Sequence, residues 1–96
     1  MNTNEWIAKQ LSRLPRKRTE MIVSSHAVDE AIHDGIDERE ISRTVREGAV
    51  FVRKCEWSDK ICFQRYDGKK NRTCVVVARF DEREIRVVTL WAKNGR

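Results

Sequence analysis

The chain has 96 residues, with 20 Lys and Arg against 15 Asp and Glu, so its formal net charge is +5. This length is typical of one small domain, and a hydrophobic fraction of 40% excludes a disordered chain. No apolar run approaches the ~20 residues of a membrane span, and Met1–Gln10 carries no secretory signal, so a cytoplasmic protein without a membrane partner is predicted.

The positive charge is concentrated in the second half of the chain. Residues 1–48 carry 8 basic and 9 acidic side chains, whereas residues 49–96 carry 12 and 6. The apolar pattern changes at the same place, from helical spacing to the alternation of strands. We therefore predict an α+β fold with the helices first, in one domain over residues 1–96 with an N-terminal part (1–22) and a core (23–92).

The N-terminal part is predicted to hold a helix and a basic linker. Apolar residues at helical spacing predict a helix over about Glu5–Leu14, which Pro15 ends. The linker Arg16–Arg18 is too charged for a core, and together with Arg13 it is either a solvated cluster or a phosphate-binding one. Met21–Val23 follows as a short strand candidate.

A helical hairpin with a tight turn is predicted next. One serine of the Ser24–Ser25 pair caps a helix of about ten residues, and Gly35 follows it where a residue with positive φ is expected. Asp37 with Glu40 three positions later is a capping box for the second helix, which Gly48 closes. The inward-facing residues are Ala27, Val28, Ala31 and Ile32 in the first helix and Ile41 and Val45 in the second.

The second half of the chain is predicted to form a sheet. Four runs rich in Val, Ile, Phe and Tyr are separated by short linkers, which favour antiparallel hairpins over crossovers. The simplest topology is a four-stranded antiparallel meander. The predicted strands are Ala49–Glu56, Ile61–Tyr66, Thr73–Phe80 and Glu84–Trp91.

Hairpin pairing then assigns each side chain to one face of this sheet. The expected pairs are Glu56 with Ile61, Tyr66 with Thr73, and Phe80 with Ile85. The face that the helices cover collects Val50, Val52, Ile61, Phe63, Cys74, Val76, Ala78, Phe80, Ile85, Val87 and Trp91, with Lys54, Arg65 and Thr89. The opposite face collects Phe51, Arg53, Cys55, Cys62, Gln64, Tyr66, Val75, Val77, Arg79, Arg86, Val88 and Leu90.

In this register Arg79 lies directly across from Arg86. Like charges directly opposite one another destabilise a sheet by roughly a fraction of a kcal/mol or more. Either both guanidinium groups turn into water or meet Glu84, or an anionic ligand such as a phosphate offsets their repulsion.

A basic loop follows the second predicted strand. Four cations surround it, and they either contact phosphates without reading bases or form a solvated turn. These cations are Arg65, Lys69, Lys70 and Arg72.

Metal binding and disulfide formation receive little support. His26, Glu30 and His33 lie one turn apart on the first helix of the hairpin, but a solvent-facing stripe is simpler than a metal site, so no metal and no cofactor are expected. His26 is also a candidate titrating group. Cys55 is expected opposite Cys62, where a disulfide is conceivable but buried thiols are favoured.

Several short motifs resemble a small prokaryotic domain of unknown function that is similar to the RelE, ParE and BrnT toxins. They are Ser24-Ser25-His26-Ala27, Gly35-Ile36-Asp37 with Ile41 and Val45, Glu47-Gly48, and Val87-Val88-Thr89-Leu90-Trp91. The resemblance implies a RelE-like fold, with a helical hairpin on an antiparallel sheet, and a metal-independent ribonuclease acting on messenger RNA. The family pattern has arginine where this chain has Glu30 and Asp34, so no role of helix arginines carries over.

The residues themselves suggest how such a ribonuclease would work. Fixed cations would hold the scissile phosphate, and a separate group would transfer protons, because arginine has a pKa above ~12. The predicted catalytic residues are Arg79 and Arg86 as the phosphate clamp, with Tyr66 or His26 for proton transfer. The predicted nucleic-acid-binding residues are Arg53, Arg65, Lys69, Lys70, Arg72 and Lys93.

Two other functions remain open at this point. The same face can bind nucleic acid or a protein without catalysis, because a fold does not fix an activity. Alternatively, an acidic antitoxin-like protein or a second copy of the chain covers it, since apolar residues lie beside the arginines. The expected partners are therefore RNA, an acidic protein, or the chain itself.

Overall fold

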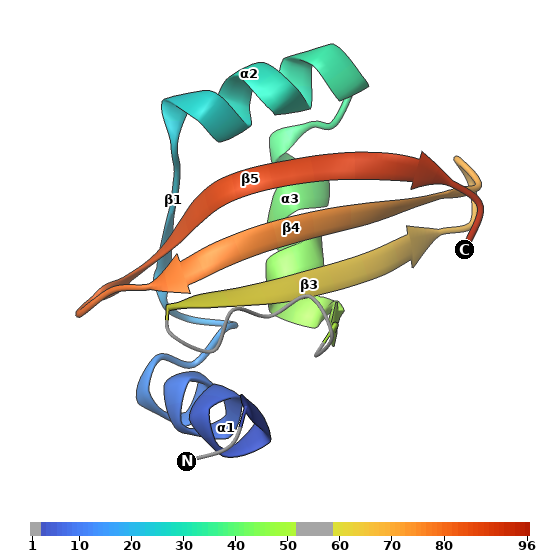
Figure 1. Ribbon diagram of the computed structural model, residues 1–96. Helices are drawn as coiled ribbons and strands as arrows, with labels where there is room; N and C mark the ends of the chain where they lie inside the picture. Colours follow the sequence, from blue (N-terminus) through green and yellow to red (C-terminus); the bar gives the residue numbers. More distant parts are fainter. Residues whose placement is uncertain (1–2, 52–58) are drawn as a thin grey trace.

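The computed structural model describes residues 3–51 and 59–96, which form three helices and one five-stranded mixed sheet in the order β1-β5-β4-β3-β2 (Figure 1). The strands are β1 (Glu20–Val23), β2 (Ala49–Val50), β3 (Lys60–Asp67), β4 (Arg72–Phe80) and β5 (Glu84–Asn94). The α+β class is confirmed, but the helices do not all precede the strands, because the strand candidate Met21–Val23 forms β1 between α1 and α2. The predicted four-stranded antiparallel meander is corrected by the addition of β1, which pairs with β5 in parallel.

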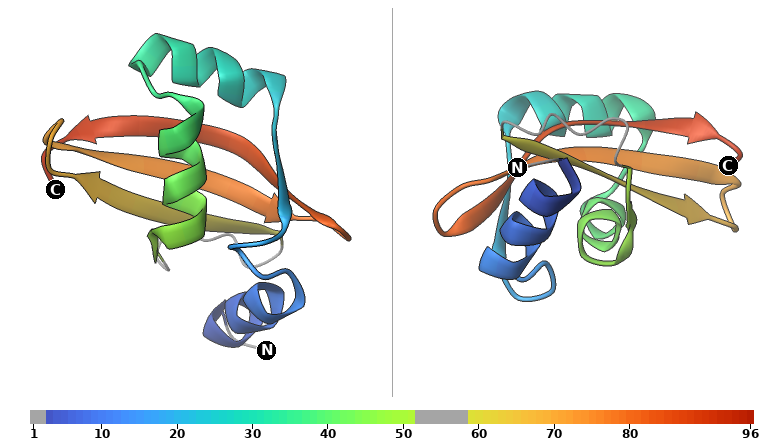
Figure 2. Two further views of the ribbon diagram at one scale, coloured as in Figure 1. Left: turned by 180° about the vertical axis from the view of Figure 1, so that it is seen from behind. Right: turned by 60° about the horizontal axis from the view of Figure 1, so that its bottom comes forward.

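The three helices form where the sequence pattern predicts them. They are α1 (Thr3–Arg13), α2 (Ser25–Asp34) and α3 (Glu38–Glu47). Seen from behind, α3 crosses one face of the sheet, while α2 lies along the β5 side (Figure 2). None of the helices in the described part of the chain has the length and apolar character needed to cross a membrane.

The caps of the helical hairpin are confirmed. The Ser24 side chain accepts a hydrogen bond from the Ala27 amide, and Gly35 ends α2 in the left-handed region at φ 65°. The Asp37 side chain accepts from the Glu40 amide at 2.8 Å. Glu40 does not complete the predicted capping box, because its side chain is buried against cations of β4 and the preceding loop.

The apolar stripe of α2 is narrower than predicted. Ala27 and Ala31 are buried, but Val28 is 41% exposed and Ile32 is 75% exposed. The reason is the position of α2 beside β5, where a helix buries a narrow line of small residues and leaves the flanking ones outside. The α2 helix therefore adds an apolar surface that the pattern had assigned to the core.

The pairing of β1 with β5 extends the sheet at the end where α2 begins. Met21 lies opposite Ile85, Val23 lies opposite Val87, and the Ser24 amide then donates to the Val87 carbonyl at 3.0 Å. Because β5 continues to Asn94 while β1 stops at Val23, the outer edge of β5 beyond this point is left for α2.

Two of the three predicted hairpin registers are confirmed. Tyr66 pairs with Thr73, and Arg79 pairs with Arg86 next to the Phe80–Ile85 pair. A β-bulge then shifts the β4–β5 register between Val77 and Ala78. A one-residue shift moves every later side chain to the other face.

The bulge corrects the predicted faces at the end of β5. Leu90 pairs with Val76 and is fully buried, whereas Trp91 pairs with Val75 and is 37% exposed. The prediction placed Trp91 under the helices and Leu90 outside, which is the reverse. By the same shift Lys93, opposite Thr73, joins the face away from α3.

The predicted first hairpin differs in register. The expected pairing would place Val50 opposite Asp67, but Val50 pairs with Phe63, and Phe51 donates its amide to the Cys62 carbonyl. Within the described residues, β2 covers Ala49–Val50 of the predicted strand Ala49–Glu56. Cys62 and Cys74 are both buried. Val52, Arg53, Lys54, Cys55 and Glu56 lie outside the described residues, so the predicted pairing of Cys55 with Cys62 does too.

A close backbone approach fixes the end of α3 against β3. A Cβ added at Gly48 would lie 2.7 Å from the Gln64 carbonyl oxygen, closer than real Cβ contacts. The Arg16 guanidinium donates to the Gly48 carbonyl at 2.7 Å and lies 5.2 Å from the centre of the Phe63 ring. One cation of the predicted basic linker therefore serves the packing of α3.

Candidate nucleic-acid interface

Three cations lie in a row across the sheet at the end where β4 finishes and β5 begins. Lys60 pairs with Arg79, and Arg79 pairs with Arg86, so their side chains share the face away from α3. We call Lys60, Arg79 and Arg86 the cationic row. The predicted arginine pair therefore exists, and β3 adds a third cation to it.

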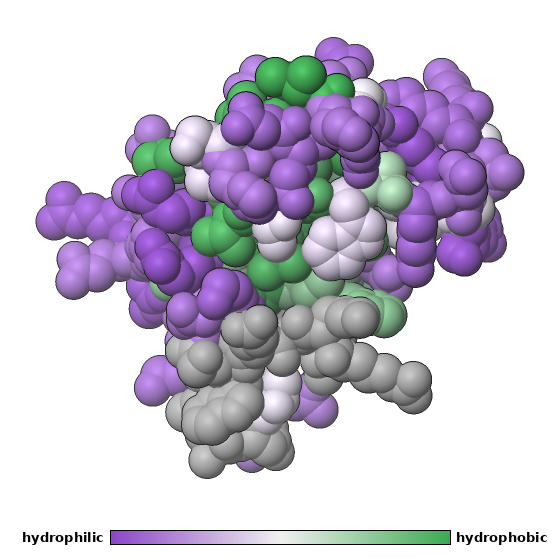
Figure 3. Space-filling view, turned by 45° about the horizontal axis from the view of Figure 1, so that its top comes forward, coloured by the Kyte–Doolittle hydropathy of each residue, from purple (hydrophilic) through white to green (hydrophobic). Residues whose placement is uncertain are grey.

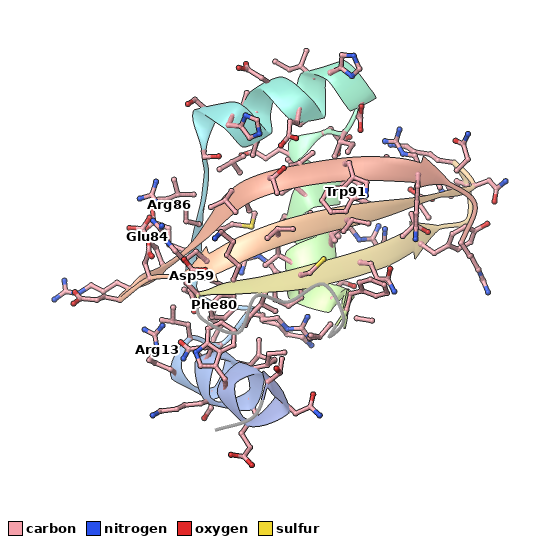
Figure 4. The ribbon with its side chains drawn as sticks, viewed as in Figure 1. Arg13, Asp59, Phe80, Glu84, Arg86 and Trp91 are labelled. Atoms are coloured by element: carbon pink, nitrogen blue, oxygen red, sulfur yellow. The ribbon has the colours of Figure 1, made fainter. Side chains whose placement is uncertain are left out.

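Carboxylates from the neighbouring turns pair with this row. Asp81 bridges the two arginines, with its Oδ1 2.9 Å from the Arg79 Nε and its Oδ2 3.3 Å from the Arg86 Nε. Glu84 lies 3.2 Å from the Arg86 guanidinium, and Figure 4 shows these two side chains together at this end of the sheet. Asp59 pairs with Lys60 at 3.1 Å.

The Asp81 carboxylate occupies the position that an external phosphate was expected to take. Partial desolvation raises the pKa of Asp81, but hydrogen bonds from Arg79 and Arg86 outweigh it, so this pKa lies below its ordinary value. Three cations and three carboxylates balance in charge, so an anionic ligand would have to displace Asp81. The sequence-based prediction did not include this bridge, although an acid two residues after Arg79 in a tight turn is a usable signal.

The ion pairs around the row are exposed enough to be exchanged. The side chains of Arg79 and Arg86 are 42% and 36% exposed, and that of Asp81 is 30% exposed. Ion pairs in contact with water contribute about 0–1 kcal/mol each. Replacement of Asp81 by another anion therefore costs little.

The same face carries aromatic and cationic side chains further along the sheet. The exposed indole of Trp91 lies on β5 between the row and Lys93 (Figure 4). At the far end Arg96 lies 4.4 Å from the centre of the Tyr66 ring. In the middle of this face the side chains of Cys62 and Val75 are buried, so they are not accessible to a ligand.

Tyr66 and the cationic row lie at opposite ends of the face. Tyr66 pairs with Thr73, and Arg79 lies six positions after Thr73 in β4, which corresponds to about 20 Å. The Tyr66 hydroxyl donates to Asn71 at 2.7 Å. The structure thus does not bring Tyr66 to the arginine pair.

His26 lies in the first turn of α2, with its Nε2 3.4 Å from the Glu30 carboxylate. It lines a shallow cavity of about 290 Å³ that also includes Asp34 and Trp91. His33, from the predicted stripe, contacts Asp34 at 3.1 Å instead. Within residues 3–51 and 59–96, no three His, Cys, Asp or Glu side chains are grouped to hold a metal ion.

The basic loop does not form one surface. Lys70 and Arg72 turn toward the buried Glu40, at 3.3 Å and 2.6 Å, and Arg72 also donates to the carbonyls of Asp34 and Gly35. Arg65 and Lys70 line the same cavity beside α3, and Lys69 is exposed in the turn. Arg72 thus joins the helical hairpin to β4, and Arg53 lies outside the described residues.

The family described as "Domain of unknown function (DUF4258)" matches residues 23–92. The chain belongs to this family. The match runs from the end of β1 to Ala92 in β5, so it includes the helical hairpin and the whole cationic row. No curated protein and no solved structure matches the chain.

In this DUF4258 chain, two carboxylates of α2 cover the outer edge of β5. Glu30 accepts hydrogen bonds from the Leu90 amide at 3.1 Å and the Thr89 hydroxyl at 2.7 Å. Asp34 accepts from the Ala92 amide at 3.1 Å. These acidic side chains satisfy edge groups of β5 that β1 is too short to reach.

Proposed function

We propose that this chain is a RelE- or BrnT-like protein that binds single-stranded RNA along the face of the sheet away from α3. The cationic row would hold phosphates, and Trp91 would stack on a base further along β5. The observation that carries the proposal is the cross-strand alignment of Lys60, Arg79 and Arg86 beside an exposed indole. In the absence of RNA, the Asp81 carboxylate would occupy the position of the phosphate between Arg79 and Arg86.

Binding of a short fluorescent single-stranded RNA, followed by anisotropy over a range of salt concentrations, tests this proposal. Arg79→Gln with Arg86→Gln should weaken binding about tenfold and reduce the salt slope by about 1.4, since each lost phosphate contact on a single strand removes about 0.7. Asp81→Asn should strengthen binding, because it frees both guanidinium groups.

Two matched variants separate these effects from net charge. Lys9→Gln with Arg83→Gln removes the same charge at exposed positions on α1 and in the β4–β5 turn. Glu82→Gln removes one acid beside Asp81 and should leave RNA affinity unchanged. Equal effects of Asp81→Asn and Glu82→Gln would contradict the proposal.

Cleavage of the bound RNA is a second proposed function, favoured by the direct pairing of Arg79 with Arg86. A group must still transfer protons, and the separation of about 20 Å along β4 disfavours Tyr66 in that role. Incubation of a long RNA with excess chelator tests this function. Cleavage products that form with the wild-type chain and are lost with Arg79→Gln and Arg86→Gln would support this function. If the wild-type chain leaves the RNA intact, only the binding function remains.

A further inference from the structure

A groove runs between α3 and the edge strand β1, on the side of the sheet opposite the cationic row. In Figure 2, seen from behind, α3 and β1 lie side by side with α2 across one end. Two cavities of about 260 and 500 Å³ occupy this groove, and Glu38 lines both. We call it the α3–β1 groove.

The end of the groove at α2 is apolar. Its cavity is lined by Val23, Val28, Ala31, Ile32, Ile36 and Ile41. Ile32 is 75% exposed and Val28 is 41% exposed, and apolar surface is visible among hydrophilic residues at the top of Figure 3, where α2 lies. Adjacent exposed aliphatic side chains beside a cavity are typical of an interaction surface.

The other end of the groove is cationic. Its cavity is lined by Met21, Ser42, Glu38 and three arginines of α3, namely Arg39, Arg43 and Arg46. Lys17 and Arg18 are exposed on the linker, whose Arg16 and Thr19 carbonyls accept from Arg46.

The arginine charges in this groove are weakly compensated. Arg46 donates to main-chain carbonyls and to the Ser42 hydroxyl, and none of these carries charge. Arg43 pairs with Glu47 at 3.5 Å, but both side chains are about half exposed, so this pair contributes little. Arg39 has no ion pair with any residue of segments 3–51 and 59–96.

We propose that the α3–β1 groove binds an acidic segment of a partner protein whose apolar side chains enter the Val28–Ile32 end. The opposite charge of the arginines selects acidic residues, and the aliphatic lining selects apolar anchors. RNA fits less well, because the described lining offers no aromatic ring for base stacking. This site is separate from the sheet face proposed to bind RNA, so the two proposals can fail independently.

The probe is a pair of labelled synthetic helical peptides with identical leucines and either glutamates or lysines at the remaining positions. The glutamate peptide should bind the wild-type chain, and Arg39→Gln with Arg43→Gln should weaken it about tenfold. Ile32→Gln should have a similar effect, while Arg79→Gln with Arg86→Gln, equal in charge change but on the other face, should not. All substituted side chains are at least partly exposed, so thermal melts should match the wild type.

Amide chemical shifts of the wild-type chain provide a second measurement that needs no variant. Shifts on adding the glutamate peptide should gather on β1, α2 and α3. The proposal is overturned if the lysine peptide binds equally well, if no groove amide shifts, or if Arg39→Gln with Arg43→Gln weakens RNA binding instead. It is also overturned if Ile32→Gln converts a dimer into a monomer in sedimentation, because a second copy would then cover the groove.

Discussion

Glu40 and Asp81 each hold two cationic side chains, yet they do so in different surroundings. Glu40 binds Lys70 and Arg72, and its side chain is 4% exposed. Asp81 binds Arg79 and Arg86, and its side chain is 30% exposed. The exposed fraction of the carboxylate therefore distinguishes the two clusters: the buried Glu40 is held within the fold, whereas the Asp81 carboxylate is accessible to exchange with a ligand.

The Glu40 cluster joins three parts of the fold. Glu40 belongs to α3, Arg72 begins β4, and the same guanidinium donates to the carbonyls of Asp34 and Gly35 at the turn between α2 and α3. The hydrogen bond to Glu40 raises the pKa of Arg72 above its ordinary value, although desolvation opposes this rise. The Arg72 guanidinium therefore stabilises the packing of α3 and the α2–α3 turn against β4.

The largest expected effect comes from removing the buried charge. Glu40→Gln should lower the free energy of unfolding by about 3 kcal/mol, because it leaves the mostly buried Arg72 without its counter-charge. In a domain of this size that corresponds to a melting temperature lower by more than about 10 °C. Chemical and thermal unfolding followed by circular dichroism measure both quantities.

Asp81→Asn is the matched control for this prediction. Its ion pairs are in contact with water, so the same measurement should show a loss of less than about 1 kcal/mol. Equal losses for the two variants would contradict this prediction, since Asp81 would then stabilise the fold as much as Glu40 does.

Asp34 extends the comparison to a carboxylate that binds the main chain. Hydrogen bonds from His33 and then from the Ala92 amide hold the pKa of Asp34 below its ordinary value. A depressed carboxyl pKa stabilises the fold above the unfolded-state value of about 3.9, and this contribution disappears as the pH falls through the lower folded-state value. The melting temperature should therefore decrease as the pH is lowered from about 4.

Asp34→Asn should remove part of that pH dependence. Asparagine can still accept from Ala92 but carries no charge, so the variant should be less stable than the wild type near pH 7, with the gap narrowing toward about pH 2. Thermal melts of both chains over this range measure the gap. A gap that stays constant with pH would show that the charge of Asp34 plays no part.

The sequence predicted those parts of the fold that depend on local chemistry. The caps at Ser24, Gly35 and Asp37 were predicted correctly, because each requires only its own residue and the next few amides. The short β3–β4 and β4–β5 turns set the registers that bring Tyr66 to Thr73 and Arg79 to Arg86.

The parts that were missed depend on distant contacts. The pairing of β1 with β5 joins segments about sixty residues apart, and no turn connects them. The bulge beside Ala78 leaves no mark in an alternating apolar run, so Leu90 and Trp91 were assigned to the wrong faces. The sequence places Asp81 in a linker, whereas in the structure its carboxylate bridges Arg79 and Arg86.

The smallest expected effect is at Tyr66, and it tests whether distance alone excludes this residue from the chemistry of the cationic row. Tyr66→Phe removes the hydroxyl that donates to Asn71 in an exposed turn but keeps the ring under Arg96, so the stability loss should be below about 1 kcal/mol. RNA affinity and any chelator-resistant cleavage should match the wild type, because about 20 Å of β4 separates this hydroxyl from Arg79. A large fall in cleavage with unchanged affinity would instead place the reacting phosphate at the Tyr66 end of the face, and would make the arginine pair a distant anchor.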